Sequence, residues 1–370
     1  MDALMLPLNW QRVRLGDIFF ITAGGDLSKP HYSNTKQSDF NYPIYSNAIE
    51  KKGLCGYSSF FIIKNKSITI TARGTIGVAF FRDYPYVPIG RLLVLQPKIS
   101  NIDCRFYAEY INSKVKFNTE QTTIPQLTIP KVALCEIPLP PLNEQIAIAD
   151  ILSALDNYLH ALRVLILKKE SVKKALSFEL LSQRKRLKGF NQAWQRVRLG
   201  DILSYEQPTK YLVATTQYLQ KGFTPILTAG KTFILGYTND KHGIYTNIPV
   251  IIFDDFTTDS KMVNFPFKVK SSAIKILSLR DNNQADLKYI YEKLTLLKHQ
   301  VTDHKRYWID EFSNFEIPLP PLNEQIAIAD ILSALDKEIA SLKNKKRQFE
   351  NIKKALNHDL MSAKIRVLKK

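Results

Sequence analysis

The sequence predicts an α+β fold in which two similar mixed domains are joined by two long antiparallel helices, with an internal pseudo-two-fold repeat. Three observations support this prediction. The stretch EIPLPPLNEQIAIADILSALD occurs twice without change, at Glu136–Asp156 and Glu316–Asp336. The nonapeptide WQRVRLGDI also occurs twice, at Trp10–Ile18 and Trp194–Ile202. After each copy of the long stretch, apolar residues continue at heptad spacing, which is typical of a coiled coil.

The repeat divides the chain into four segments. Because 370 residues exceed the size of one ordinary hydrophobic core, two folded domains are expected. We place the first mixed domain at 1–142, the first helix at 143–189, the second mixed domain at 190–322 and the second helix at 323–370. Trp10 and Trp194 are expected to be core anchors that pack each domain onto its helix.

Between nonapeptide and helix, the two halves have similar lengths but different sequences. A few anchors nevertheless correspond: Gly56-Tyr57 matches Gly236-Tyr237, and each pair follows a Pro-Ile dipeptide. The apolar strand near Arg91 matches the one near Lys275, and each precedes a helix-like segment. The two domains are therefore predicted to share one fold and to differ on its surface.

The long repeat begins with an extended lead-in, since its prolines cannot lie inside a helix. Asn143 is predicted as the N-cap and Gly189 as the C-terminal stop, which gives a helix of roughly 40 residues, about 60 Å long. The expected seam comprises Ile148, Leu152, Leu155, Leu159, Leu162 and Ile166 in the first copy. In the second copy it comprises Ile328, Leu332, Leu335, Ile339, Leu342, Phe349, Ile352, Leu356 and Leu360, with a break at Lys346. The alternative is that each helix covers only its own domain.

The charge of the chain favours a polyanionic partner. The 52 Lys and Arg residues against 34 Asp and Glu give a formal net charge of +18 and a pI near 9.6. Such an excess attracts nucleic acid through counterion release, although solubility or a general preference for lysine would give the same composition.

No secretory leader and no membrane-spanning stretch are expected. Cys55, Cys104 and Cys135 are expected to be small core residues in a reducing cytoplasm.

The sequence lacks a recognisable catalytic constellation. AGKT at Ala229–Thr232 resembles the end of a phosphate-binding loop, but Pro225 occupies the position of the first glycine. The six histidines form no ligand cluster. Asp254 and Asp255 are the most enzyme-like acidic pair, yet adjacent strand residues point to opposite faces, which weakens a shared metal site. A binding protein without a catalytic or metal site is therefore predicted.

These motifs resemble the specificity subunit of type I restriction–modification systems. The resemblance covers essentially the whole chain, and it depends on the W-x-x-V-x-L-G-D-I and I-P-L-P-P-L-N-E-Q-I segments in duplicate. It implies that the mixed domains are target-recognition domains, each of which reads one half of a split, asymmetric DNA site. It also implies that the helices form an antiparallel coiled-coil spacer, which sets the distance between half-sites.

The resemblance further implies a set of partners. These are double-stranded DNA, two copies of a modification (methyltransferase) subunit, and restriction or motor subunits bound through them, in the cytoplasm and without a membrane. Cofactors would belong to the partners, as S-adenosylmethionine, ATP and Mg, and none to this chain. Two alternatives remain: a specificity subunit for a fused methyltransferase–nuclease, and an orphan DNA-binding protein without partners. A stand-alone enzyme is the weakest hypothesis.

Candidate DNA contacts are basic, hydroxyl, amide and acidic side chains on expected loops. In the first domain they are Lys51, Lys52, Tyr57, Ser58, Arg73 and Thr75. In the second they are Lys231, Thr232, Tyr237, Asn239, Lys241, Asp254, Asp255 and Thr257. The candidate partner-docking residues, at the start of each helix, are Asn143, Glu144, Gln145, Asn323, Glu324 and Gln325. Basic residues that either track phosphates or form a solvated helix face are Lys168, Lys169, Lys173, Lys174, Arg184, Lys185 and Arg186.

Overall fold

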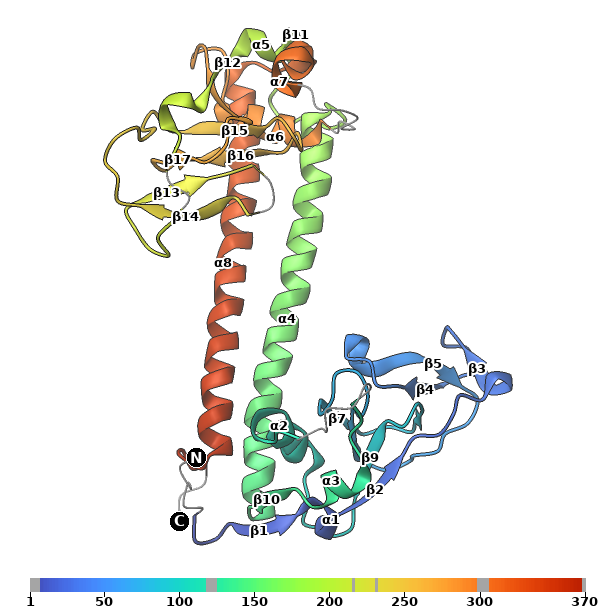
Figure 1. The fold of residues 1–370 in the computed structure, drawn as a ribbon. Coiled ribbons are helices and arrows are strands. Elements are labelled where there is room, and N and C mark those ends of the chain that lie inside the picture. The colour runs from blue at the N-terminus through green and yellow to red at the C-terminus, as the bar shows by residue number, and fades with distance from the viewer. Residues whose placement is uncertain (1–6, 118–124, 215–216, 230–231, 298–305, 368–370) are drawn as a thin grey trace. The chain divides into compact units, whose positions relative to one another are not determined.

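The computed structural model describes residues 7–117, 125–214, 217–229, 232–297 and 306–367 (Figure 1). The chain folds into two compact units: unit 1 contains residues 1–163 and 344–370, and unit 2 contains residues 164–343. Each unit thus holds one mixed domain together with part of both long helices. The units divide within the helices, whereas the boundaries drawn from the sequence separate each domain from the helix that follows it.

The duplicated nonapeptide forms the same short frame in each unit. In unit 1 it gives strand β1 (Gln11–Arg14) and the one-turn helix α1 (Leu15–Ile18). β1 pairs antiparallel with β10 (Glu136–Leu139), the extended lead-in to the long helix. Unit 2 repeats this order and pairing with β11 (Gln195–Arg198), α5 (Leu199–Ile202) and β19 (Glu316–Leu319).

A four-stranded antiparallel sheet is the centre of each domain, in the order β2-β9-β6-β7 in unit 1 and β12-β18-β15-β16 in unit 2. A helix packs on each sheet, α2 (Cys104–Lys114) on the first and α6 (Leu287–Leu296) on the second. The matched strand and helix expected from the sequence are therefore confirmed. The strands are β2 (Phe19–Ala23), β6 (Ser67–Ile70), β7 (Ala79–Arg82), β9 (Leu93–Pro97), β12 (Leu203–Glu206), β15 (Val250–Asp254), β16 (Ser260–Val263) and β18 (Ile274–Leu279).

A smaller sheet completes each domain, in the order β3-β5-β4-β8 in unit 1 and β14-β13-β17 in unit 2. Tyr57 lies opposite Pro43 and Tyr237 lies opposite Pro225, so the predicted anchors occupy the same register. The strands are β3 (Tyr32–Ser33), β4 (Tyr42–Tyr45), β5 (Leu54–Ser58), β8 (Val87–Pro88), β13 (Thr224–Leu227), β14 (Ile234–Thr238) and β17 (Lys268–Val269). The short helices are η1 (Lys29–His31), η2 (Glu50–Gly53), α3 (Ile129–Ala133), η3 (Pro208–Tyr211), α7 (Tyr307–Asp310) and η4 (Phe312–Asn314).

The two long helices, α4 (Leu142–Leu181) and α8 (Leu322–Met361), have 40 residues each, which confirms the predicted length. Their ends correct the prediction. The carbonyl of Pro141 accepts the first helical hydrogen bond, from Gln145 N at 3.1 Å, so Asn143 lies inside the first turn and is not the N-cap. At the other end, α4 stops at Leu181 and not at Gly189, because Gln183 adopts a left-handed conformation with φ +63°.

The heptad seam is buried largely as predicted, and the helix segments within each unit run antiparallel. Asp156 of α4 meets Lys353 of α8 in unit 1, and Lys173 of α4 meets Asp336 of α8 in unit 2. One seam position is corrected, because Ile352 is 49% exposed while Lys353 is half-buried. The seam therefore continues from Phe349 to Lys353, a step of four residues. The apolar stem of Lys353 packs inward, and its ammonium forms an ion pair with Asp156.

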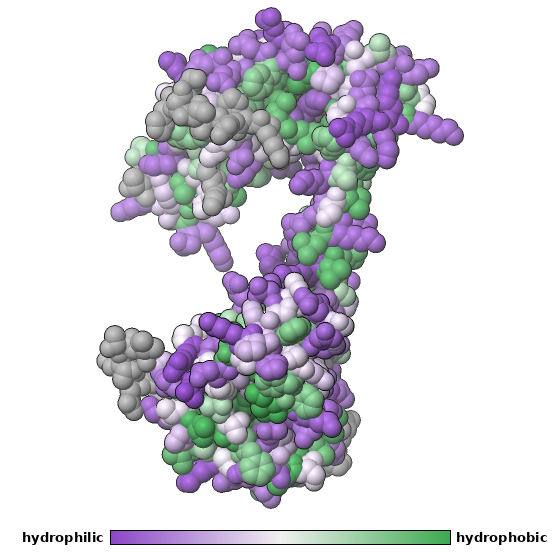
Figure 2. Space-filling view, turned by 90° about the vertical axis from the view of Figure 1, so that its right-hand side faces the viewer, coloured by the Kyte–Doolittle hydropathy of each residue, from purple (hydrophilic) through white to green (hydrophobic). Residues whose placement is uncertain are grey.

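The surface is mixed in character. On the face in Figure 2, hydrophilic residues cover most of the area and smaller apolar areas lie between them. Within the described residues, no helix combines the length and apolar character needed to cross a membrane.

Cys104 is buried as expected, whereas Cys55 is exposed, which corrects its assignment to the core.

In unit 2, the end of α4 is held by a buried lysine of the domain. Lys293, on α6, is 7% exposed and donates to the carbonyl of Leu181, the last residue of α4. This bond satisfies a carbonyl that has no partner within its own helix. Burial lowers the pKa of Lys293 from its ordinary 10.5 to about 8, since the charged ammonium loses hydration.

The lysine predicts a pH-dependent stability of unit 2. Between pH 8 and 10.5 the unfolded chain carries a proton on this lysine that the folded chain has lost, so the free energy of unfolding should rise with pH by up to about 3 kcal/mol. Below pH 8 both states are protonated and this contribution is constant. Urea unfolding of the full chain at pH 7.5–10.5 measures the effect. Lys293→Met should flatten the rise, and an equal rise in both proteins would contradict the assignment.

Candidate nucleic-acid interface

In unit 1 the first candidate segment is the turn between β4 and β5. Lys51 and Lys52 are exposed and have left-handed backbone conformations, with φ +48° and +55°. The carbonyl of Lys52 accepts a 2.6 Å hydrogen bond from the buried Arg82, whose guanidinium lies 3.6 Å from the centre of the Tyr45 ring. The backbone of the turn is therefore fixed while both ammonium groups remain in solvent, as a phosphate contact requires.

The second candidate segment of unit 1 is the loop after β6. Arg73 and Thr75 are exposed there, and Gly74 has a left-handed conformation with φ +69°. Asn47, in the β4–β5 turn, accepts a 2.7 Å hydrogen bond from the backbone of Ala72. The structure thus brings the two predicted segments together on one side of the domain, through a contact that the sequence did not indicate.

Two candidates of unit 1 lie on β5 rather than in a loop. Tyr57 is half-buried, so part of its ring remains accessible. Ser58 is only 1% exposed and accepts a hydrogen bond from Phe60 N at 3.2 Å. Ser58 shapes the end of the strand, and its assignment as a DNA contact is corrected because no base can reach it.

In unit 2 the equivalent turn, between β13 and β14, carries Thr232, which is exposed. Lys231 lies outside the described residues. Tyr237 is half-buried on β14, in the position equivalent to Tyr57, and Asn239 and Lys241 are exposed beyond the strand. These residues keep the accessibility that a nucleic-acid contact needs.

The acidic pair of unit 2 is buried, which corrects its assignment as a base reader. Asp254 is 6% exposed and accepts from Phe256 N at 2.9 Å and from the hydroxyl of Thr257 at 2.7 Å. Asp255 is 5% exposed and lines a different pocket, so the prediction that the two carboxylates point to different sides is confirmed. In the described part of the chain, no group of three or more His, Cys, Asp or Glu residues is placed to hold a metal ion.

The loops after β6 and β15 are equivalent, although their sequences differ. Ile68 pairs with Leu95 of β9, as Ile251 pairs with Leu277 of β18, so Arg73 and Phe256 occupy the same position beyond their strands. Phe256 is 55% exposed. Phe256 was not among the candidates predicted from the sequence, although an alignment of the two halves on the apolar strands β6 and β15 places it opposite Arg73.

The predicted docking residues Glu144 and Glu324 are buried instead. Glu144 accepts from the indole of Trp10 at 3.0 Å and forms two hydrogen bonds with Arg366, at 2.6 and 2.8 Å. In unit 2, Glu324 accepts from Trp194 at 3.0 Å and from Arg186 at 3.1 and 2.6 Å. Each arginine follows the end of the long helix that begins in the other half of the sequence. We call these two sets the Trp–Glu–Arg clusters, and they confirm the two tryptophans as anchors.

Gln145 and Gln325 are also fully buried. Each joins the long helix to the start of the helix on the central sheet: Gln145 accepts from Asp103 N, and Gln325 accepts from Asp286 N, both at 2.9 Å. The docking assignment is therefore corrected for the glutamates and glutamines. They are duplicated because each copy binds an equivalent partner inside its own unit, and both copies are buried. Asn143 and Asn323 remain exposed.

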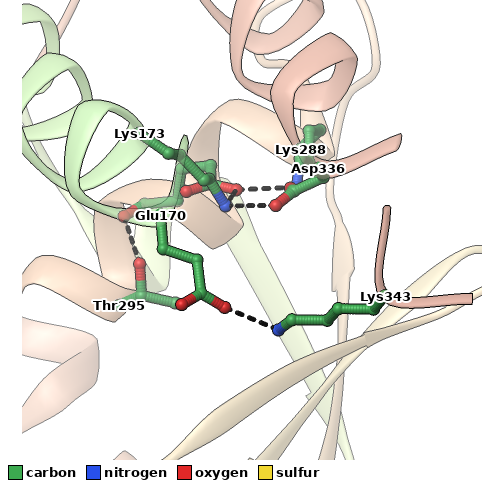
Figure 3. A network of polar contacts seen from close by, with 7 residues as sticks. Glu170, Lys173, Lys288, Thr295, Asp336 and Lys343 are labelled. Carbon is green, nitrogen blue, oxygen red and sulfur yellow. Dashed lines mark hydrogen bonds and ion pairs between the residues drawn. The ribbon is translucent and has the colours of Figure 1, made fainter. Parts of the chain in front are cut away.

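A third duplicated contact involves the lysines of the helices. In unit 2, Lys173 contacts Asp336 at 2.6 Å and Glu292 at 3.2 Å, and Lys288 bridges the same two carboxylates (Figure 3). In unit 1, Lys353 contacts Asp156 at 2.7 Å and Glu109 at 3.8 Å. Both networks join α4, α8 and the domain helix of their own unit.

Ion pairs engage several of the basic residues considered as phosphate contacts. Lys169 meets Glu338 at 2.8 Å and Lys185 meets Glu179 at 2.9 Å, in addition to the pairs of Lys173 and Arg186. Lys168, Lys174 and Arg184 are exposed. Much of the expected basic face therefore serves contacts within the protein.

A family model described as the type I restriction modification DNA specificity domain matches residues 7–170 and 191–351. The chain belongs to this family. The two matches coincide with the two halves of the repeat, and each extends into the long helix at its end, to residue 170 in α4 and to residue 351 in α8.

Individual relatives agree with the family. The specificity subunit of the Escherichia coli type I restriction enzyme EcoR124I/EcoR124II is 47% identical over 180 residues, which cover 45% of this chain and 44% of that protein. This chain thus spans less than half the length of that relative. The MjaVIII specificity subunit of Methanocaldococcus jannaschii is 25% identical over 99% of this chain and 95% of its own length.

Solved structures share the fold. The type I restriction–modification S subunit from M. genitalium has a TM-score of 0.71 at 20% identity, over 96% of this chain and 98% of that one. Since the strand order recurs in both halves here, the family fold agrees with two similar mixed domains and two long helices.

The Trp–Glu–Arg clusters predict a large stability cost for removing one arginine. Arg186→Met should lower the free energy of unfolding clearly more than the loss of an exposed ion pair does, because it leaves the carboxylate of Glu324 buried without its cation. Urea unfolding of the full chain, followed by tryptophan fluorescence, measures this change. Arg12→Met is the matched control, because Arg12 lies 3.8 Å from Glu136 with both side chains 63% exposed, and its cost should stay within about 0.5 kcal/mol. Equal costs would contradict the role of the cluster.

Proposed function

We propose that this chain is the DNA sequence-specificity subunit of a type I restriction–modification complex. Each mixed domain reads one half of a bipartite, asymmetric DNA site, and the helices set the distance between the half-sites. The observation that carries the proposal is the contrast within the repeat: the central sheets of the two domains have the same strand order and stand on identical frames, but the domains present different side chains at equivalent loops. Two ligand surfaces that differ on one common frame fit two different half-sites.

DNA contact is supported by the chemistry of these loops. In unit 1, Lys51, Lys52 and Arg73 are exposed on two adjoining segments whose backbones are fixed by Arg82 and Asn47. Lysines attract phosphates without regard to sequence, whereas a loop arginine can donate two hydrogen bonds to guanine. The net charge of +18 adds a general attraction to DNA.

Partner binding belongs to the same proposal. Identical surfaces in both halves of a chain can bind two copies of one partner, here a modification subunit. Besides Asn143 and Asn323, the repeat exposes Ile146 and Ile326 at matched positions, where they are 38% and 43% exposed. Restriction or motor subunits would join through the modification subunits. S-adenosylmethionine, ATP and Mg would serve these partners, and the chain itself would act without catalysis, in the cytoplasm.

The remaining alternatives differ in their partners. A fused methyltransferase–nuclease partner would replace separate modification and motor subunits, and an orphan DNA-binding protein would need neither. The match to the type I family favours separate modification and motor subunits. The neighbouring genes discriminate between the three arrangements.

The proposal predicts a split methylation motif that depends on this gene. Genome-wide mapping of N6-methyladenine in the source strain and in a strain without the gene should show one bipartite motif, with a modified adenine in each half, that is lost with the gene. Restoring the gene with Arg73→Ala should relax one half-site only, by about 1–3 kcal/mol of discrimination if Arg73 contacts guanine. Methylation that is unchanged in the deletion strain would contradict the function.

Partner docking gives a separate prediction. The complex with the modification subunit should contain two copies, and Ile146→Ser or Ile326→Ser should each remove one, because a polar side chain weakens an apolar contact. The mass of the purified complex, measured by light scattering, reports the number of copies bound. Leu134→Ser is the control, since Leu134 is 61% exposed but lies outside the identical segment. Two bound copies on the double isoleucine variant would exclude this surface.

A further inference from the structure

A polar pocket opens in the domain of unit 2, beside the loop that follows β15. Its volume is about 570 Å³, and the residues that line it include Gln207, Asp255, Phe256, Lys275 and Arg306. Gln207 precedes η3, Lys275 comes from β18, and Arg306 immediately precedes α7. The pocket therefore collects side chains from four separate segments of one domain.

A buried ion pair forms the inner wall of this pocket. The ammonium of Lys275 lies 2.9 Å from a carboxylate oxygen of Asp255, and the two side chains are 4% and 6% exposed. The other carboxylate oxygen of Asp255 accepts from Trp308 N at 3.0 Å. Lys275 also donates to the amide oxygen of Gln207 at 3.3 Å, so it holds that side chain in place.

The fold does not require this ion pair. By the register of the central sheets, the positions equivalent to Asp255 and Lys275 in unit 1 are Ala72 and Leu93, which are 0% and 2% exposed. The same architecture is thus built there with apolar residues. Replacement of a buried ion pair by apolar residues is often neutral or stabilising, so the pair is weak evidence for a stabilising role. A role in ligand recognition explains why it occurs in one domain only.

The mouth of the pocket carries two exposed side chains of complementary chemistry. Arg306 presents a planar guanidinium, and Phe256 presents an aromatic ring that is 55% exposed. Phe256 occupies the position that Arg73, a candidate base reader, occupies in the first domain. Both domains therefore expose a large side chain at the start of this loop. The carboxylate of Asp255 already accepts from Trp308 N and pairs with Lys275, so the guanidinium of Arg306 is the charged donor that the pocket offers to a ligand. A ligand with two adjacent acceptors and a flat apolar surface fits it.

We propose that this pocket reads one guanine of the half-site contacted by the second domain. Arg306 donates two hydrogen bonds to O6 and N7 of the guanine, Phe256 packs against the neighbouring base, and the Lys275–Asp255 pair positions Gln207 and the loop. The inference rests on the proposed function and adds the residues and the base class of one half-site. The first domain lacks the pair, so its half-site is read by different chemistry.

Selection from a library of random DNA duplexes by the full-length chain tests the proposal. Wild-type protein should select a bipartite motif with a guanine in the second half-site. Arg306→Gln should reduce the preference at that position by about 10- to 100-fold and leave the first half-site unchanged. Arg306→Lys should not restore it, because an ammonium lacks the planar fork of donors. Arg196→Gln is the charge-matched control, since Arg196 is 84% exposed on β11, away from the pocket, and should leave both half-sites unchanged.

The ion pair is tested by the double substitution Asp255→Asn with Lys275→Met. Asn keeps an acceptor for Trp308 N, so melting should show a folded chain, while the preference at the same guanine position weakens. Uniform loss of affinity in Arg306→Gln with rescue by lysine would identify a phosphate contact and overturn the proposal. An unchanged second half-site would overturn it as well. A wild-type chain that selects no motif would overturn both this inference and the proposed function.

Discussion

The buried carboxylate at the start of each long helix joins the nonapeptide of its unit to the segment that follows the other long helix. Glu144 and Glu324 are 2% and 0% exposed, and a buried charge is tolerated only when cations and donors surround it. The indole comes from the nonapeptide at the start of the domain, and the guanidinium comes from beyond the end of the other helix. Three distant parts of the sequence must therefore be in place before either carboxylate is satisfied.

This dependence gives a physical reason for the duplication. The nonapeptide, the first turn of the long helix and the terminal arginine form one set of partners, and a change in any one of them would leave a buried polar group without its partner. The same holds for Gln145 and Gln325, whose amides meet the start of the domain helix in both units. Identity over the frame is thus compatible with wide divergence in the domains, because the glutamines contact backbone N–H groups of the domains, which every residue except proline provides.

The divergence of the domains includes equivalent loops. In unit 1 the loop after β6 carries Arg73, and the buried residues beside it are Ala72 and Leu93. In unit 2 the loop after β15 carries Phe256, and the equivalent buried positions hold the Lys275–Asp255 ion pair. Hydrogen bonds within each domain fix both loops. Asn47 accepts from Ala72 N in unit 1, and in unit 2 Asp254 accepts from Phe256 N and Asp255 accepts from Trp308 N. Rigid loops with different side chains on one architecture suit recognition of two different ligands, since little conformational entropy is lost on binding.

The repeat, the mixed fold, the length of the helices and most of their seam were predictable from the amino-acid sequence, because periodicity and identical segments are local properties. Which polar residues face inward was not predictable, because it depends on contacts between distant segments. Glu144, Gln145, Asp254 and Asp255 looked like surface chemistry, yet each has partners supplied by residues distant in sequence or by its own turn. Likewise, steps of three and four are both allowed after Phe349, and the acidic partner Asp156 selected Lys353 over Ile352. A buried polar side chain needs a hydrogen-bond or ion-pair partner, and the tertiary fold determines which residue provides it.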